Sequence, residues 1–411
     1  MTEKKAIAIL LLVVALLLVF SAGCQQPAKP PSPATIKVGL LYPVTGDITG
    51  KAGDSVKGVT LAIEEINAAG GIASLGGAKL VPVTGDTRGT PSDGARETER
   101  LIKNERVTAI VGAYQSTITI AATQVAEELE TPFIDTGSSA DVITERGFHY
   151  TFRFCPKSSE YSRVMVQFLP DLEKLAGYKV KRVALIHENS GFGSSNALEL
   201  KKALNDDNLE LATEVSYNAR NVTNLNSEIA QVLASKPDAI FEVTYVNDSI
   251  LIRQALARSG STIPLLDSAG GTISPEYIQA LGPLAEGTLT SSAYSRFTAG
   301  GKDFNDRFRA RFGIDANEDI MYSYQAVWVL KDALERAGTV DHHAVRDALA
   351  ATDMPRGPHM VLSYERLRFD ASGQSEYSSI LIVQIQNGSY VPVWPGKFAT
   401  SKVQINQTGR P

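Results

Sequence analysis

Hydroxyl-bearing and small residues follow two short apolar segments of this 411-residue sequence, and their types suit ligand binding. The segment 107–111 is followed by Gly112-Ala113-Tyr114-Gln115-Ser116 and then by helical spacing. Ser116 would lie near a helix N-cap, where unpaired N–H groups favour a carboxylate or another acceptor. The segment 132–135 is followed by Thr136-Gly137-Ser138-Ser139, which adds hydroxyl and N–H groups at the same sheet edge. Taken alone, these serines are better explained as cap or turn residues.

Motifs of the common enzyme classes are absent from the sequence. It contains no G-x-x-x-x-G-K-[ST] phosphate loop, no G-x-S-x-G nucleophile elbow and no H-E-x-x-H metal pair. The run 191–196 approaches a dinucleotide-binding loop but lacks the third glycine, so it predicts a strand-to-helix turn. His342 and His343 follow Asp341 at an expected helix start, where adjacent side chains point apart. We therefore expect no catalytic residue, no metal and no cofactor.

Two series of alternating strands and helices would position the polar residues. The first series predicts strands at 36–42, 80–83, 107–111 and 132–135, with helices near 56–66, 94–104 and 117–129. The second predicts strands at 182–187, 210–215, 239–243 and 264–266, with helices near 159–175, 194–204, 225–234 and 248–258. Each series is typical of a parallel sheet covered by helices on both faces. The predicted fold class is α/β, with two doubly wound parallel-sheet lobes.

The C-terminal part of the chain predicts helices, a hairpin and a tail. Helices are expected at 304–312, where Phe304, Phe308 and Phe312 form a core-facing stripe, and at 322–337. The segments 379–386 and 390–393 flank Asn387-Gly388 and predict a β-hairpin. Residues 400–411 are expected to be a loose tail.

The composition is that of a globular protein without a basic surface. The chain has 40 Lys+Arg against 45 Asp+Glu, so its formal net charge of -5 argues against a nucleic-acid partner. It contains only 2 Cys, which excludes a disulfide-stapled scaffold. Cys155 is expected to be a small buried apolar residue.

The N-terminus predicts export. Lys4 and Lys5 precede an apolar run at 6–20, and small residues follow before Cys24, which is the pattern of a signal peptide over 1–23. Ser21-Ala22-Gly23-Cys24 resembles a lipobox, although Leu is commoner at the position of Ser21, so Cys24 is the predicted lipid attachment site. A plain signal peptide or an uncleaved anchor are the alternatives. Residues 24–35 contain four prolines and predict an extended, lipid-anchored linker.

Several segments together resemble a known family. They run from Ile36-Lys37-Val38-Gly39-Leu40-Leu41-Tyr42-Pro43-Val44-Thr45-Gly46 through Ala62-Ile63-Glu64-Glu65-Ile66-Asn67-Ala68-Ala69-Gly70-Gly71-Ile72, Ile110-Val111-Gly112 and Leu129-Glu130-Thr131-Pro132-Phe133-Ile134 to Tyr150-Thr151-Phe152-Arg153. In this order and spacing they resemble the type I periplasmic binding proteins, with the branched-chain amino-acid binding proteins of ABC importers as the nearest members. The resemblance extends from residue 36 to about residue 395.

The resemblance implies two lobes joined by three hinge crossovers, near 155–157, near Tyr294 and near 369–370. Lobe 1 would comprise 36–156 plus 294–368, and lobe 2 would comprise 157–293 plus 369–398, with a tail at 399–411. The ligand would lie between the lobes, beyond the carboxyl ends of the strands.

The resemblance also implies the site. Three residues match positions that hold the ligand's carboxylate and amino groups: Ser116, Gly137 and Ser139. Phe192 and Tyr245 match positions that bring aromatic rings over the ligand, although loop packing explains Phe192 about as well. The family usually places a carboxylate for the ligand's ammonium where this sequence has Ala269. Asp267 could serve from a different angle, or could cap the helix expected from about residue 274.

The function implied is that of an extracytoplasmic solute-binding protein of an ABC importer, tethered to the membrane and read by a permease. Lobe closure would capture a small polar ligand, with a branched-chain amino acid favoured and amides, urea-like molecules and aromatic acids left open. A ligand-sensing receptor that feeds a signalling partner is the alternative. An exported enzyme would need a nucleophile or metal cluster that the sequence does not provide.

Overall fold

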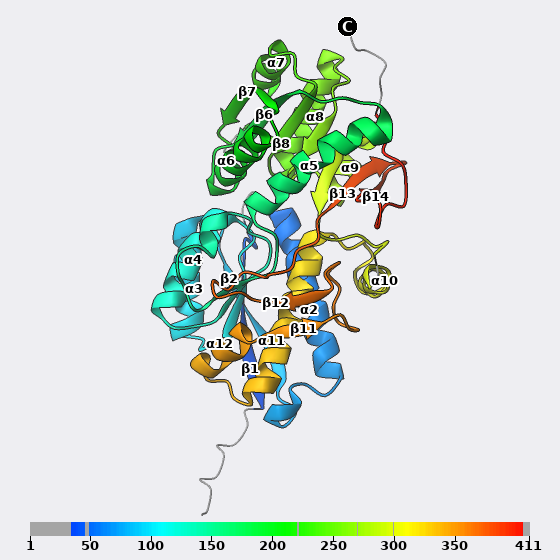
Figure 1. Ribbon diagram of the computed structural model, residues 1–411. Coiled ribbons are helices and arrows are strands. Elements are labelled where there is room, and N and C mark those ends of the chain that lie inside the picture. Colours follow the sequence, from blue (N-terminus) through cyan, green and yellow to red (C-terminus); the bar gives the residue numbers. More distant parts are fainter. Residues whose placement is uncertain (1–33, 46–48, 220–221, 269, 299, 406–411) are drawn as a thin grey trace, which may run out of the picture. The chain divides into compact units, whose positions relative to one another are not determined.

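The computed structural model describes residues 34–45, 49–219, 222–268, 270–298 and 300–405 (Figure 1). The expected signal peptide, Cys24, nearly all of the linker and Ala269 lie outside the described residues. Among the helices that are described, none is both long enough and apolar enough to cross a membrane.

The first sheet is entirely parallel and has the strand order β2-β1-β3-β4-β5. Its strands are β1 (Thr35–Tyr42), β2 (Lys79–Asp86), β3 (Ala109–Gly112), β4 (Phe133–Asp135) and β5 (Thr151–Arg153). Its helices are α2 (Thr49–Ala68), α3 (Pro91–Lys103), α4 (Ser116–Glu128), α10 (Gly301–Phe312), α11 (Glu318–Ala337) and α12 (His342–Ala350). We call this sheet with its helices the first half.

Helices cover both faces of the first sheet, and its inner strands β3 and β4 are buried along their whole length. Val38 and Leu40 pack in the cluster that contains α2, α10 and α11, whereas Leu41 packs in the cluster that contains α3 and α4. In α2, a Cβ on Gly58 would collide with the carbonyl oxygen of Ile320, so glycine permits α2 and α11 to approach closely. The phenylalanines of α10 pack in the same core, as predicted.

The second sheet has the order β14-β13-β10-β9-β8-β6-β7. Its strands are β6 (Arg182–Glu188), β7 (Glu210–Tyr217), β8 (Ala239–Val243), β9 (Leu265–Asp267), β10 (Leu289–Ser292), β13 (Leu381–Gln386) and β14 (Ser389–Trp394). Its helices are α5 (Ser158–Ala176), α6 (Gly191–Asp206), α7 (Asn226–Ala234), α8 (Val246–Ser259) and α9 (Pro275–Leu281). The hairpin β13–β14 adds the antiparallel edge. We call this sheet with its helices the second half.

The chain passes between the two sheets three times. It leaves β5 for α5 over 154–157 and leaves β10 for α10 over 293–300. The third passage, over 369–380, follows the short pair β11 (Asp353–Pro355) and β12 (Arg366–Arg368), which the sequence did not predict.

Two further expectations concern single segments. Cys155 is buried in the core of the first half, as predicted. The expectation of a loose tail from residue 400 is wrong as far as residue 405: Val403 is buried and the Gln384 Nε2 donates to the Gln404 carbonyl oxygen over 2.7 Å. Residues 406–411 lie outside the described residues.

Candidate functional site

The loop between β3 and α4 places Ser116 at the first position of the helix. Gln115 is the N-cap residue, and its side chain makes no capping hydrogen bond. Ser116 is buried, and its Oγ accepts a hydrogen bond from the Ala140 backbone N–H over 3.3 Å. The loops after β3 and β4 therefore lie against each other, as expected for neighbouring parallel strands.

The loop after β4 is held from within by Asp135 and Arg153. Asp135 Oδ1 accepts hydrogen bonds from the N–H groups of Gly137 at 3.3 Å and Ser138 at 3.1 Å. The buried Arg153 guanidinium donates to the carbonyl oxygens of Ser138 at 3.0 Å and Ala140 at 2.7 Å. Burial raises the pKa of Asp135 to about 6, although the charge of Arg153 opposes the shift.

Gly137 brings this loop next to Asp319, in the first turn of α11. A Cβ on Gly137 would lie 3.4 Å from Asp319 Oδ1, and the side chain of Asp319 is only 7% exposed. The φ of Gly137 is 157°, which favours glycine. Asp319 is a residue that the sequence did not nominate, because nothing near it in the sequence marks it.

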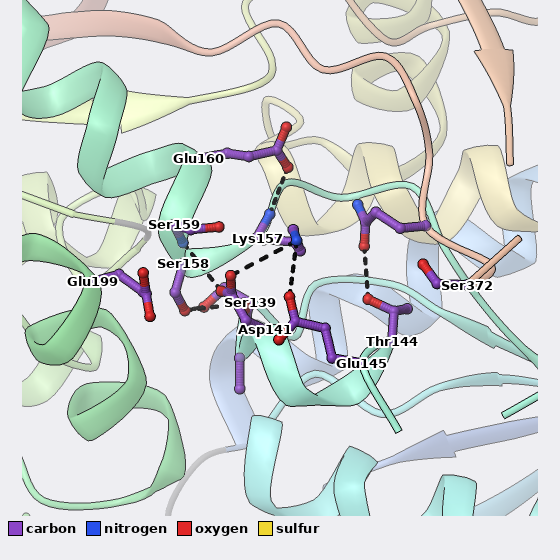
Figure 2. Close-up of polar contacts among 12 residues, drawn as sticks. Ser139, Asp141, Thr144, Glu145, Lys157, Ser158, Ser159, Glu160, Glu199 and Ser372 are labelled. Carbon is purple, nitrogen blue, oxygen red and sulfur yellow. Dashed lines mark hydrogen bonds and ion pairs between the residues drawn. The ribbon is translucent and has the colours of Figure 1, made fainter. Parts of the chain in front are cut away.

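Ser139 connects the two halves. Its Oγ accepts a hydrogen bond from Asn196 Nδ2, on α6, over 3.0 Å. Its carbonyl oxygen accepts from the backbone N–H of Ser158, at the start of α5, over 2.7 Å. Figure 2 shows Ser158 beside Ser139, with the Ser158 Oγ donating to the Ser139 carbonyl oxygen over 3.0 Å.

The first passage between the sheets is tied to this same loop region (Figure 2). Lys157 Nζ lies 3.0 Å from Glu145 Oε1, and the Lys157 backbone N–H donates to Glu160 Oε2 over 2.9 Å. The Ser159 backbone N–H donates to Asp141 Oδ1 over 3.1 Å. The start of α5 is thus capped by its own residue Glu160 and is also hydrogen-bonded to Asp141 of the first half.

A turn does connect β6 to α6, but it lies at 189–190; the prediction of a turn over 191–196 is wrong in its placement, because these residues already belong to α6. The Glu188 carboxylate accepts hydrogen bonds from the N–H groups of Ser190 at 2.7 Å and Gly193 at 2.6 Å, which caps the helix. A Cβ on Gly193 would collide with the carbonyl oxygen of Glu188, so this position requires glycine. The turn delivers Phe192, buried, to the beginning of α6.

Three aromatic rings meet between the loops of the two halves. Tyr245, the N-cap residue of α8, lies with its ring centroid 5.1 Å from that of Phe192. On its other side it lies 6.2 Å from the ring of Tyr114, which belongs to the loop after β3. Burial, and then the negative charges of Asp319, Glu276 and Asp267, raise the pKa of Tyr114 well above its usual value. Acidic groups from α11, α9 and β9 therefore act on the same aromatic cluster.

Asp267 lies inside the second half at the end of β9. Its Oδ2 accepts hydrogen bonds from the Thr272 N–H and Oγ1, both at 2.8 Å, and from Thr290 Oγ1 at 3.1 Å. It is fully buried and pairs in register with Glu242 of β8. Its negative charge contributes to the raised pKa of Tyr114, and its Oδ2 accepts the hydrogen bonds that hold the loop after β9.

The arrangement suits a small molecule with charges of both signs. The N-terminal ends of α4, α6, α8 and α11 contribute Ser116, Phe192, Tyr245 and Asp319 to one region, and helix N-termini favour an anionic group. Asp319, Glu276 and Asp267 favour a cationic one. Among the described residues no group of His, Cys, Asp and Glu has the arrangement of a metal site.

Comparison with known proteins assigns the family. Residues 35–388 match the family model described as periplasmic binding protein. The Leu/Ile/Val-binding protein homolog 7 of Brucella abortus is 28% identical over 407 residues, which cover 95% of this chain and 99% of that protein.

Solved structures share the fold. The LivJ substrate-binding protein of Streptococcus pneumoniae, in complex with isoleucine, has a TM-score of 0.76 and 24% identity, with 87% of this chain and 97% of that chain covered. An ABC-transporter solute-binding protein of Rhodopseudomonas palustris, in complex with 3,4-dihydroxybenzoic acid, has a TM-score of 0.76 and 20% identity, with 92% and 99% covered. The α/β fold with its parallel-strand sheets is that of type I periplasmic binding proteins, and the chain belongs to the periplasmic binding protein family.

Proposed function

We propose that this protein is the extracytoplasmic solute-binding component of an ABC importer and that it captures a small zwitterionic solute, an amino acid or a close relative, between its two halves. The observation that carries the proposal is the meeting of Tyr114 with Tyr245 and Phe192 in the field of Asp319. Aromatic rings supply apolar surface for a side chain, and the helix ends and the acids supply partners for a carboxylate and an ammonium.

Ser116, Gly137 and Ser139 of the first half are the proposed partners of the ligand's carboxylate, and Phe192 and Tyr245 of the second half are the proposed cover. The family position for an ammonium-binding carboxylate is occupied by Ala269. We propose that Asp319 supplies that negative charge here, with Asp267 contributing from a distance through its field.

Closure would move the halves about the three passages over 154–157, 293–300 and 369–380. The contact of Asn196 with Ser139 supports this proposal, because it joins the two halves beside the first passage. The closed protein would be read by a membrane permease, and a lipid on Cys24 would keep it at the membrane surface.

Calorimetric titration of the purified protein tests the ligand class. Leucine, isoleucine, valine, their amides and aromatic acids form the panel, and mass spectrometry of each recovered compound reports turnover. Binding of an amino acid at one site per chain, with the compound recovered intact, is the expected result. Binding of the amides or aromatic acids alone would contradict the zwitterion assignment, and chemical conversion would contradict a binding role.

A ligand-sensing receptor remains the second candidate, since the same two halves could present their occupancy to a signalling partner. The assignment to transport is supported by membership of the periplasmic binding protein family. Uptake of the bound solute by cells that carry or lack this chain separates the two functions.

A further inference from the structure

A cavity lies beside the second passage between the sheets, and its wall is formed by other residues than the serines, the glycine and the aromatic residues of the candidate site. Its volume is about 350 Å³, within the range of small-molecule pockets. Ile278 of α9 and Tyr390 of β14 line it from the second half, and Ile314 and Asn317, between α10 and α11, line it from the first. None of Ser116, Gly137, Ser139, Phe192 and Tyr245 contributes to its wall.

Asn317 lies in the wall of this cavity and carries a buried donor. Its Oδ1 accepts from the Ile320 N–H over 2.9 Å and so caps α11. Its Nδ2 is buried and finds no hydrogen-bond partner in the part of the chain that the structure describes, although the residue is only 5% exposed. A buried amide donor without a partner costs free energy, which an acceptor placed in the cavity would recover.

The wall carries two guanidinium groups and two carboxyl groups. Arg296 Nη1 and Arg309 Nη1 each lie 3.2 Å from an oxygen of Asp315, so one carboxylate is shared by two guanidinium groups. Glu318 also lines the cavity, but its oxygens accept hydrogen bonds from the Ala293 N–H at 2.9 Å and from the Tyr322 hydroxyl at 3.0 Å. The remaining wall is largely apolar.

We propose that this cavity is a second ligand site, which takes a small organic acid with a compact apolar body. The body would lie against Ile278, Ile314 and Tyr390. The carboxylate would accept from Asn317 Nδ2 and face the guanidinium groups of Arg296 and Arg309. The site is separate from the solute site proposed at the strand ends.

The position of the cavity gives such a ligand a consequence for the rest of the molecule. Its wall combines both halves with Tyr294 and Ser295, which belong to the second passage, and with Ser292 at the end of β10. A ligand that contacts both halves and the second passage should change its affinity when the halves move relative to each other. Occupancy of the cavity would therefore change the affinity of the strand-end site, and the reverse effect must be equal.

Ligand-observed fluorine NMR with 4-fluorobenzoate tests the site on the full chain. Ile278→Trp and Ile314→Trp fill the cavity at half-buried positions, and Leu284→Trp is the matched control at an exposed position of the second half. Asn317→Asp keeps the oxygen that caps α11 but replaces the donor with a negative charge. Tyr245→Ala disables the strand-end site and shows which of the two sites binds the probe.

We expect the wild type, Leu284→Trp and Tyr245→Ala to bind 4-fluorobenzoate alike. Both cavity-filling variants should lose binding, and Asn317→Asp should weaken it by at least tenfold, which is the effect of losing a hydrogen bond to a charged group. Circular dichroism verifies that each variant is folded. Unchanged binding in both cavity-filling variants, loss of binding in Tyr245→Ala, or no binding to the wild type at millimolar probe would overturn the proposal. The cavity can be tested in Tyr245→Ala, in which the strand-end site is disabled. A negative result for the cavity is therefore distinguishable from a failure of the proposed function.

Discussion

The side-chain amide of Asn196 donates a hydrogen bond to the hydroxyl of Ser139 over 3.0 Å and so connects α6 of the second half with the loop after β4 of the first. The same Nδ2 also donates to the Phe192 carbonyl oxygen over 3.1 Å, which orients it within its own helix. Asn196 thus positions one of the proposed cover residues and holds the opposite half at the same time.

Replacing Asn196 by Ala should weaken solute affinity by about fivefold, since a net hydrogen bond contributes about 1 kcal/mol. The lost hydrogen bond joins the two halves and contributes little to the fold of either half. The thermal midpoint of the ligand-free protein should therefore change little. Titration calorimetry and thermal denaturation check both values. Asn205→Ala, on the exposed face of α6, is the matched control and should change neither. Equal affinity for wild type and Asn196→Ala would remove this bond from the closure account.

Tyr245→Ala should reduce affinity by about tenfold to a hundredfold, because it removes a ring that packs against both Phe192 and Tyr114. Tyr245→Phe retains the ring and should remain within about threefold of the wild type if packing is the ring's contribution. The two titrations together separate the ring from the hydroxyl. A larger loss in Tyr245→Phe than in Tyr245→Ala would show that the ring is not a cover.

Asp319→Asn should discriminate between ligand classes. For a solute with an ammonium group we expect a loss of about tenfold or more, the effect of removing a charged hydrogen-bond partner. For a carboxylic acid that lacks an amine, affinity should stay the same or improve. Competition binding with an amino acid and its deaminated analogue measures the difference.

Asp303→Asn is the control for Asp319→Asn, since Asp303 is also an acid in the first turn of a helix of the first half but is exposed. The affinity of Asp267→Asn for the same two ligands is compared with that of Asp319→Asn, since both acids are assigned to the site. If Asp319→Asn weakens both ligand classes equally, the residue is structural and the ammonium assignment fails.

Glu242 makes the stability of the second half depend on pH. Burial, followed by the negative charges of Asp267 and Asp248, raises the pKa of Glu242 well above its usual value. A raised carboxyl pKa means that the folded state holds the proton more tightly than the unfolded state does. The stabilisation is complete below the unfolded pKa and is lost as pH rises through the folded one. Burial also raises the pKa of Asp248, to about 7. This residue therefore also lowers the free energy of unfolding as the pH rises.

Glu242→Gln should therefore increase the free energy of unfolding at pH 7 and flatten its decline with rising pH. Urea denaturation at a series of pH values between acid and alkaline conditions measures both effects. Asp206→Asn, an exposed acid of the same half, should leave the slope unchanged. A steeper decline in Glu242→Gln than in the wild type would contradict the assigned direction.

Much of the fold was readable from the sequence because strands buried on both faces leave apolar runs, as β3 does without a break and β8 does except at Glu242. The helices around them carry periodic apolar faces, and the change from strand to helix before α6 was predicted, although α6 begins at Gly191 and so earlier than expected. The short strands β11 and β12 carry no such pattern and form only by pairing with each other. The segment up to Ile405 was misjudged because its order comes from hydrogen bonds to β13.

The candidate site was only partly readable for a related reason. Ser116 and Ser139 follow strands, so their placement is local. Asn196 has the sequence context of an ordinary helical polar residue, and Asp319 reaches Gly137 from a helix that begins far along the chain. Contacts of this kind arise from tertiary packing and leave no local signal.

We propose that a solute bound at the strand ends draws the two halves together. The solute is later released without chemical change. Small-angle X-ray scattering, recorded with and without a saturating amount of the amino acid that calorimetry identifies, tests it most directly. We expect a smaller radius of gyration with ligand in the wild type, and a smaller change in Asn196→Ala. Identical scattering curves for the ligand-free and the ligand-saturated wild type would contradict it.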